Sequence, residues 1–253
     1  TLSSVVRPAK YGKDDPDDPT EEPKPALTKA QGINRATWDL RMEGARRIAS
    51  KLDAGEPEQG PMVAPGKYTL RLVAAGTTLE QPVEVRADPR STIAPEALQA
   101  NIAFGVALRD AMDRALGYID AVRAIREQTV DLRRRTESNA AASQLRATAD
   151  TVIARTTAIE AELHNPGAQV VYDILAGREG GAKLYSQLSP LYSWAIQSDD
   201  APTQGMLERK AWLDGELARI GAEITALRAG EVARMEDEAT ALALPRVIVP
   251  GAR

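Results

Sequence analysis

Apolar residues recur every three or four positions over the second half of this chain, and no other feature constrains its fold as strongly. The first such series occupies one face of a segment from about residue 94 to 135: Phe104, Leu108, Met112, Leu116, Ile119, Val122 and Ile125. An α-helix has 3.6 residues per turn, so this spacing predicts a long amphipathic helix. Thr92 or Ala94-Pro95 is expected to start this helix, because proline in the first turn needs no donor and the Glu96 carboxylate faces the positive end of the helix dipole.

The same spacing predicts up to three further helices. One begins near Ser138 or Asn139 and ends at His164-Asn165-Pro166-Gly167, and a shorter one contains Pro190, which predicts a kink or a break. The last begins after Asp199-Asp200-Ala201-Pro202-Thr203. The residues on their inward faces are Leu145, Ala149, Val152, Thr156, Ile159 and Leu163, then Leu184, Leu188, Leu191, Tyr192 and Trp194, then Met206, Leu213, Leu217, Ile220, Ile224 and Leu227.

Each apolar stripe is stabilised only when another element covers it. Burying a Leu or Ile side chain contributes about 1.5–3 kcal/mol, and four stripes cover one another most economically in an antiparallel arrangement. We therefore expect residues 91–245 to form an antiparallel bundle of three to four long helices. The first helix would be about 60 Å long.

Before residue 90 the pattern has a period of two instead. The segment 67–73 alternates charged residues with β-formers, and the segment 78–86 resumes the alternation after Gly76. This predicts a hairpin over residues 67–86 that turns at Ala75-Gly76. An earlier strand is expected over residues 33–40, with Trp38 as a core residue. Residues 32–90 are therefore assigned to a β-sandwich, and the fold class is α+β with several domains.

The two ends of the chain are expected to lie outside these domains. Thr1–Val6 is predicted to be a short strand, and the proline-rich acidic segment from Pro8 to Pro25 to be a disordered loop, so residues 1–31 form one unit. The loop lacks the Asp-x-Asp-x-Asp-Gly spacing of a calcium site, which favours a plain solvated loop. Residues 246–253 are expected to form a tail.

Composition excludes several function classes. The net charge of −4 is mild and predicts no nucleic-acid partner. The chain has no cysteine, which excludes disulfides and thiolate chemistry. No apolar run reaches the length of about 18 residues that a transmembrane helix needs.

The residues also show no catalytic constellation. His164 is the only histidine, and we expect it at a helix end or on the surface. The neighbouring carboxylates Glu160 and Glu162, like those at 236–238, are expected on solvated helix faces rather than converging on one bond. We therefore predict no catalytic, no cofactor-binding and no metal-binding residue.

Two clusters are candidates for an interaction surface. Arg133, Arg134 and Arg135 could contact phosphate or an anionic glycan, although cations also stabilise a helix C-terminus. Tyr192 and Trp194, with Tyr185, form an aromatic group that could be a carbohydrate platform or part of the core. Gly180-Gly181-Ala182-Lys183 lacks the frame of a phosphate-binding loop and is interpreted as a turn.

One stretch supports a family resemblance. The motif N-x-x-x-W-D-x-R at residues 34–41, followed by P-G-x-Y-T-x-R-L at residues 65–72, resembles the carboxy-terminal region of bacterial sialidase/sortilin-type β-propeller proteins, often named BNR/Asp-box glycosyl hydrolases. It is also similar to the Ig-like domain of the flagellar hook-capping protein. The resemblance continues through residues 81–90 and into the helices.

The resemblance implies a partial Ig-like β-sandwich whose first strands lie upstream of Thr1. Its open sheet edges would then be completed by an upstream β-propeller fragment, on the same or a separate chain. This chain contains no Asp-box turn, and the family offers no catalytic residue to carry over. The resemblance further implies a periplasmic or extracellular location.

Two functions are therefore expected. The leading hypothesis is a non-catalytic structural or interaction module, the C-terminal part of a larger secreted sortilin/sialidase-like protein, with self-association through the helical bundle as a further option. The alternative is an accessory portion of a secreted glycoside or peptide hydrolase whose active site lies in the upstream propeller. A carbohydrate-binding module is a third hypothesis and would use Tyr192 and Trp194.

Overall fold

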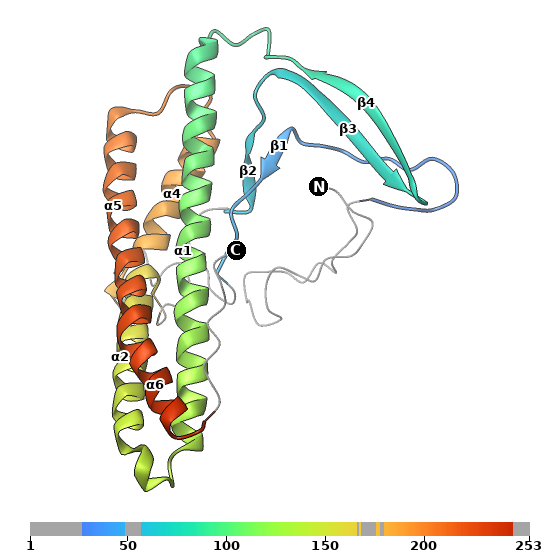
Figure 1. The fold of residues 1–253 in the computed structure, drawn as a ribbon. Helices are drawn as coiled ribbons and strands as arrows, with labels where there is room; N and C mark the ends of the chain where they lie inside the picture. The colour runs from blue at the N-terminus through green and yellow to red at the C-terminus, as the bar shows by residue number, and fades with distance from the viewer. Residues whose placement is uncertain (1–26, 49–56, 166, 168–175, 178–179, 245–253) are drawn as a thin grey trace.

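A computed structural model shows how the chain folds (Figure 1). The structure describes residues 27–48, 57–165, 167, 176–177 and 180–244. The predicted strand at Thr1–Val6, the acidic loop and the tail 246–253 lie outside the described residues. Within them, long helices and small antiparallel sheets confirm the α+β class.

The longest element is α1 (Pro95–Arg135), and it organises the helical part of the molecule. Its 41 residues correspond to about 60 Å, as predicted. Proline lies in its first turn and three arginines lie in its last, as the sequence indicated. Helices α2 (Ser143–Leu163), α4 (Leu184–Ile196) and α5 (Gln204–Leu227) all pack against it.

Helices α2 and α4 follow one another along α1 (Figure 1). A short 3-10 turn, η1 (Ala140–Ala142), precedes α2 and is capped by Asn139, whose Oδ1 accepts a hydrogen bond from the Ala141 N–H at 3.0 Å. Of the kink or break predicted at Pro190, the break is wrong, because α4 continues through the proline to Ile196 as one helix. Leu188 and Tyr192, on either side of the proline, are fully buried, so tertiary packing outweighs the lost backbone hydrogen bond.

The last helical column consists of three segments in sequence. Thr203 caps α5, since its Oγ1 accepts a hydrogen bond from the Met206 N–H at 3.3 Å. The helix then passes through a π segment, η3 (Arg228–Val232), into α6 (Ala233–Ala241). The column lies beside α2 in its lower half in Figure 1, where Arg155 of α2 binds Glu231 of η3 at 2.7 Å.

The described strands form two separate two-stranded antiparallel sheets. Strand β1 (Arg41–Glu43) pairs with β2 (Gln59–Met62), and β3 (Gly66–Ala74) pairs with β4 (Thr77–Val85). The close approach of β1 and β2 requires glycine, because a Cβ at Gly60 would overlap the carbonyl of Met42. In the described part of the chain neither sheet has a third strand, so the sandwich itself stays a prediction.

The prediction of a strand over residues 33–40 is wrong. These residues form no strand; Ile33 is fully exposed, and the short strand begins only at Arg41. Leu40 has a φ of 61°, which ends any extended run just before it. Trp38 is half-buried rather than a core residue: it packs edge-on against Tyr68 with ring centroids 6.0 Å apart, and its Nε1 donates to the Arg41 carbonyl.

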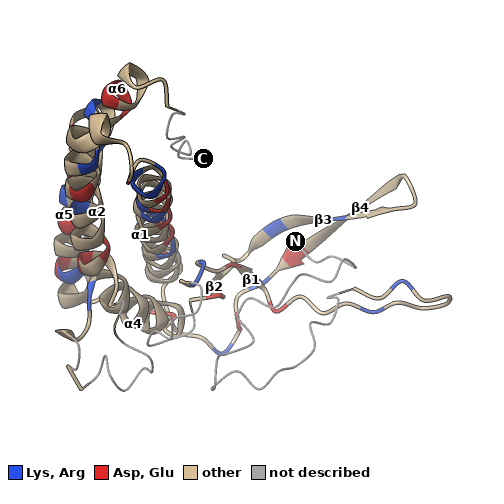
Figure 2. Cartoon of the chain, turned by 90° about the horizontal axis from the view of Figure 1, so that it is seen from below, with Lys and Arg blue, Asp and Glu red and all other residues tan. Residues whose placement is uncertain are grey.

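The hairpin, in contrast, is where the sequence placed it. The turn residues Ala75 and Gly76 have φ values of 48° and 76°, so both adopt the left-handed conformation that a two-residue type I′ turn needs. The register from Gly66 opposite Val85 to Ala74 opposite Thr77 is unbroken. Figure 2 shows the hairpin projecting away from the helices.

Candidate interaction surface

The aromatic group predicted as an interaction site is divided by the fold. Tyr185 and Tyr192 are fully buried, whereas Trp194 is 64% exposed. The two tyrosines join the helices to the β part: the Tyr185 hydroxyl donates to the Arg46 carbonyl at 2.5 Å, and the Tyr192 hydroxyl donates to the Gln59 carbonyl at 2.7 Å. Burial raises the pKa of Tyr192, so it remains a neutral donor. These tyrosines are core residues and do not form a platform with Trp194.

The arginine cluster is used within the fold. Arg133 binds Asp150 of α2 at 2.5 Å, and Arg134 and Arg135 both bind Asp131 one turn earlier, at 2.7 and 2.8 Å. Each of the three guanidinium groups therefore has a carboxylate partner. Together with their position in the last turn of α1, this supports a structural role for the cluster.

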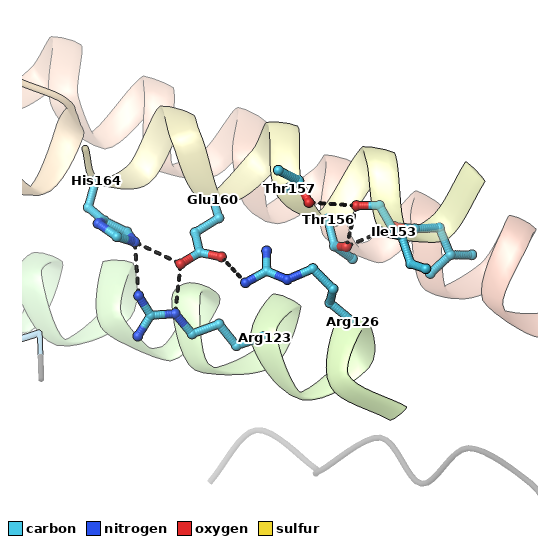
Figure 3. Close-up of polar contacts among 8 residues, drawn as sticks. Arg123, Arg126, Ile153, Thr156, Thr157, Glu160 and His164 are labelled. Carbon is cyan, nitrogen blue, oxygen red and sulfur yellow. Dashed lines mark hydrogen bonds and ion pairs between the residues drawn. The ribbon is translucent and has the colours of Figure 1, made fainter. Parts of the chain in front are cut away.

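A polar cluster that the sequence reasoning missed lies between α1 and α2 (Figure 3). Glu160 is buried and accepts hydrogen bonds from Arg123 Nε at 2.7 Å and from Arg126 Nη2 at 2.5 Å. His164, at the end of α2 and also buried, has its Nε2 2.8 Å from the same carboxylate. The expectation of a helix end holds for His164, but the expectation of a solvated face is wrong for Glu160, because two arginines from α1 cover it.

The electrostatics of this cluster are those of a structural ion network. Burial raises the pKa of Glu160, but hydrogen bonds from His164, Arg123 and Arg126 outweigh burial and lower it to about 2. A carboxylate only accepts, so the bond from His164 requires a proton on Nε2. Glu160 is thus held ionised and saturated with donors, which is unsuited to general acid–base work at neutral pH.

The sequence does contain a signal for this cluster. Glu160 and His164 are spaced i, i+4 beside the apolar positions Ile159 and Leu163, and Arg123 and Arg126 are spaced i, i+3 beside Val122 and Ile125. Charged residues adjacent to two inward stripes of opposite helices are candidates for a buried pair. Glu162, two residues on, is exposed as predicted and binds Arg219 of α5.

The other carboxylates do not converge either. Asp237 is exposed, and Glu236 and Glu238 are half-buried on α6, where Glu238 Oε1 accepts from the Thr148 hydroxyl at 3.2 Å. Across the described ranges, no three His, Asp or Glu side chains come together as a metal site. None of the helices in the described part has an apolar stretch sufficient to span a lipid bilayer.

One groove runs between α1 and α5, with a volume of about 1100 Å³. Small residues are among those that line it: Gly117, Ala121, Gly221 and Ala222. Acidic and basic side chains both line it, and Arg46 pairs with Asp113 at 3.5 Å and with Asp120 at 3.6 Å. Figure 2 shows basic and acidic residues interleaved along these helices. Mutual neutralisation leaves the groove without a preference for an anion or a cation.

The most prominent uncovered surface is one face of the β3–β4 hairpin. Alternate residues of β3 and their partners on β4 share this face, which we call the apolar hairpin face: Tyr68, Leu70, Leu72, Ala74, Thr77, Leu79, Gln81 and Val83. Trp38 covers it at Tyr68, but Leu70, Leu72 and Leu79 are each 50–61% exposed. Leu72 and Leu79 lie directly opposite each other.

The opposite face of the hairpin is polar. It carries Lys67 opposite Glu84 and Arg71 opposite Glu80, and the latter pair forms a salt bridge of 2.7 Å. An amphipathic two-stranded hairpin of this kind is marginally stable in water unless its apolar face is covered. The apolar hairpin face is therefore the strongest candidate for an interaction surface in the described residues.

Comparisons of this chain with models of protein families, with curated proteins and with solved structures give no significant match.

Proposed function

We propose that this chain is a non-catalytic interaction module, and that its hairpin forms a sheet with β-strands of a partner domain. The observation that carries the proposal is the apolar hairpin face, with three exposed leucines across two paired strands. Covering one such side chain contributes about 1.5–3 kcal/mol, and a flanking strand would also satisfy the outward N–H and C=O groups of an edge.

The proposal also includes an Ig-like fold for the β part of the chain. The motif around Trp38 and Tyr68 resembles the Ig-like region of sialidase/sortilin-type proteins, and in such a sandwich the hairpin would be two of several strands. The partner is then an upstream β-propeller part of a secreted protein, on the same or a separate chain. The helices would act as a long antiparallel bundle that supports the β part through Tyr185 and Tyr192.

The chemistry of the helices also favours a module without catalysis. The one histidine of the chain donates to Glu160, and the cluster is enclosed between two helices rather than placed in the groove. The cationic residues 133–135 are paired with Asp131 and Asp150. These groups hold the helices together.

Site-specific photo-cross-linking tests the proposal. A photoreactive phenylalanine analogue is placed at Leu72, on the apolar hairpin face, in the protein as its natural host produces it. The matched control carries the analogue at Leu207, an exposed leucine of α5 outside the hairpin (43% exposed). We expect cross-links from position 72 to a β-strand of another domain, and at least tenfold fewer from position 207.

The other outcomes decide between functions. Cross-links from Leu72 to the same hairpin of a second copy would replace the proposal with self-association. Equal labelling from both positions, or none, contradicts it. If the captured domain is a hydrolase whose turnover falls in a Leu72→Ser variant, the chain is an accessory part of a glycoside or peptide hydrolase.

A further inference from the structure

We infer that the partner strand adds to the outer edge of β3 rather than that of β4, and that it alternates apolar with acidic residues. This inference rests on the proposed function and specifies which edge and which chemistry it uses. The backbone register shows which groups face outward, the position of Pro82 distinguishes the two edges, and the charges of the polar face indicate the chemistry of the added strand.

The register determines which backbone groups face outward. In a two-residue turn the carbonyl of Ala74 accepts from the N–H of Thr77, so this pair is hydrogen-bonded. Hydrogen-bonded and non-hydrogen-bonded pairs alternate along an antiparallel ladder. The backbone N–H and C=O groups of residues on the apolar hairpin face therefore bond between β3 and β4. Those of residues 67, 69, 71 and 73 point away from β4.

The same alternation of pairs places the backbone nitrogen of Pro82 on the outer edge of β4. Pro82 lies opposite Thr69, in a non-hydrogen-bonded pair, so its missing N–H leaves the β3–β4 ladder intact. What it removes is one of the outward donors of β4. Proline on an edge strand is a known device against strand addition. The outer edge of β3 has no proline and offers a complete set of donors and acceptors.

The charges indicate the chemistry of a strand that adds to β3. On the polar face β3 carries Lys67 and Arg71, and β4 carries Glu80 and Glu84. Arg71 binds Glu80 but keeps 66% of its side chain exposed. A strand beside β3 would place its own side chains next to these cations, so acidic residues on that face are favoured. On the other face the strand would extend the row of Tyr68, Leu70 and Leu72 with apolar side chains.

Two proline substitutions test the edge. Val73 and Thr78 are partners in one non-hydrogen-bonded pair, so Val73→Pro removes an outward donor of β3 and Thr78→Pro removes one of β4 at the same distance from the turn. The probe is a fluorescent nine-residue peptide of alternating valine and glutamate, titrated against the full chain and followed by anisotropy. A valine–lysine peptide of equal length is its charge control. Amide exchange at Leu70 and Leu72 checks that each variant keeps the hairpin.

We expect Val73→Pro to raise the Kd of the valine–glutamate peptide at least tenfold and Thr78→Pro to change it less than twofold. The valine–lysine peptide should bind at least tenfold more weakly. Stronger loss in Thr78→Pro overturns the edge assignment, and equal binding of the two peptides overturns the partner chemistry. If neither peptide binds, this inference is wrong. The proposed function is tested separately by the cross-links from Leu72.

Discussion

At the scale of single residues, environment decides the role of each charged group. Glu160 and Glu162 are two positions apart on α2, yet one is buried under Arg123 and Arg126 and the other is exposed. Thr156, one turn before Glu160, is buried and satisfies its hydroxyl by donating to the Val152 carbonyl at 2.8 Å. Glu160 and the Thr156 hydroxyl are both paired, which is the condition for burying such groups.

Glu160 makes stability depend on pH in a defined window. Its pKa falls from the usual 4.5 to about 2 in the folded chain, so its contribution is complete above pH 4.5 and is lost as pH falls towards 2. At about 1.4 kcal/mol per pKa unit this amounts to about 3 kcal/mol. Glu160→Gln should therefore lower the free energy of unfolding by about 3 kcal/mol at pH 7 and by little at pH 2, measured by urea denaturation.

The matched control for this variant is Glu127→Gln, because Glu127 is an exposed glutamate of α1 one residue after Arg126. It should change the free energy of unfolding by less than about 0.5 kcal/mol. Equal effects of the two substitutions at pH 7 would contradict a structural role for the buried cluster.

The turn of the hairpin offers a second prediction at this scale. Ala75 has a φ of 48°, which alanine adopts at a cost and asparagine tolerates. Ala75→Asn should stabilise the hairpin by about 0.5–1 kcal/mol, seen as a two- to fivefold gain in amide protection at Leu70 and Leu72. Gly76→Ala, at a φ of 76°, should reduce the same protection.

At the scale of elements, the spacing of inward residues explains where the last helix changes form. Along α5 the buried positions are separated by three or four residues up to Leu227, and the next buried position is Val232, five residues on. In a regular α-helix five residues would turn Val232 about 140° away from the core side. The π segment takes up the extra residue, so Val232 and Met235 still face α2 and the core.

Deleting Gly230 should therefore convert η3 into a regular α-helix without moving α6. We expect the free energy of unfolding, measured by chemical denaturation, either to rise or to fall by no more than about 1 kcal/mol. Deleting Gly215, an exposed glycine in the regular part of α5, is the control and should cost more than about 3 kcal/mol because every later inward residue rotates off the core. A large loss from deleting Gly230 would show that the π geometry itself is needed.

At the scale of the whole molecule, stability and recognition reside in different parts. The buried apolar side chains are concentrated on α1, α2, α4 and α5, with Ala45 and Ile48 added from the segment after β1. The hairpin contributes almost nothing to this core, since only Val85 among its residues is buried. Because the helical core does not depend on the hairpin, the hairpin can bind or release a partner without unfolding the helices.

This division predicts opposite responses to substitution. The double variant Leu72→Ser/Leu79→Ser should alter the free energy of unfolding of the helices by less than about 0.5 kcal/mol, because both side chains are more than half exposed. Leu108→Ala, at a fully buried position of α1, should lower it by about 2–5 kcal/mol. Circular dichroism at the helical band during thermal unfolding measures both, and a large loss in the double variant would mean that the hairpin belongs to the core.

The sequence by itself determined the features that depend on neighbouring residues. The period of 3.6 placed α1 and a last helix that starts at the segment 199–203, and Ala75-Gly76 placed the turn of the hairpin, because turns and one-sided apolar patterns act over a few residues. Only the tertiary structure decided that Glu160 is buried, that Tyr192 and Trp194 lie in different environments, and that residues 33–40 form no strand. Each of these depends on groups brought from elsewhere: the arginines of α1 in the first case and the carbonyl of Gln59 for Tyr192. Residues 33–40 pair with no strand in the described part of the chain, and the positive φ of Leu40 separates them from β1.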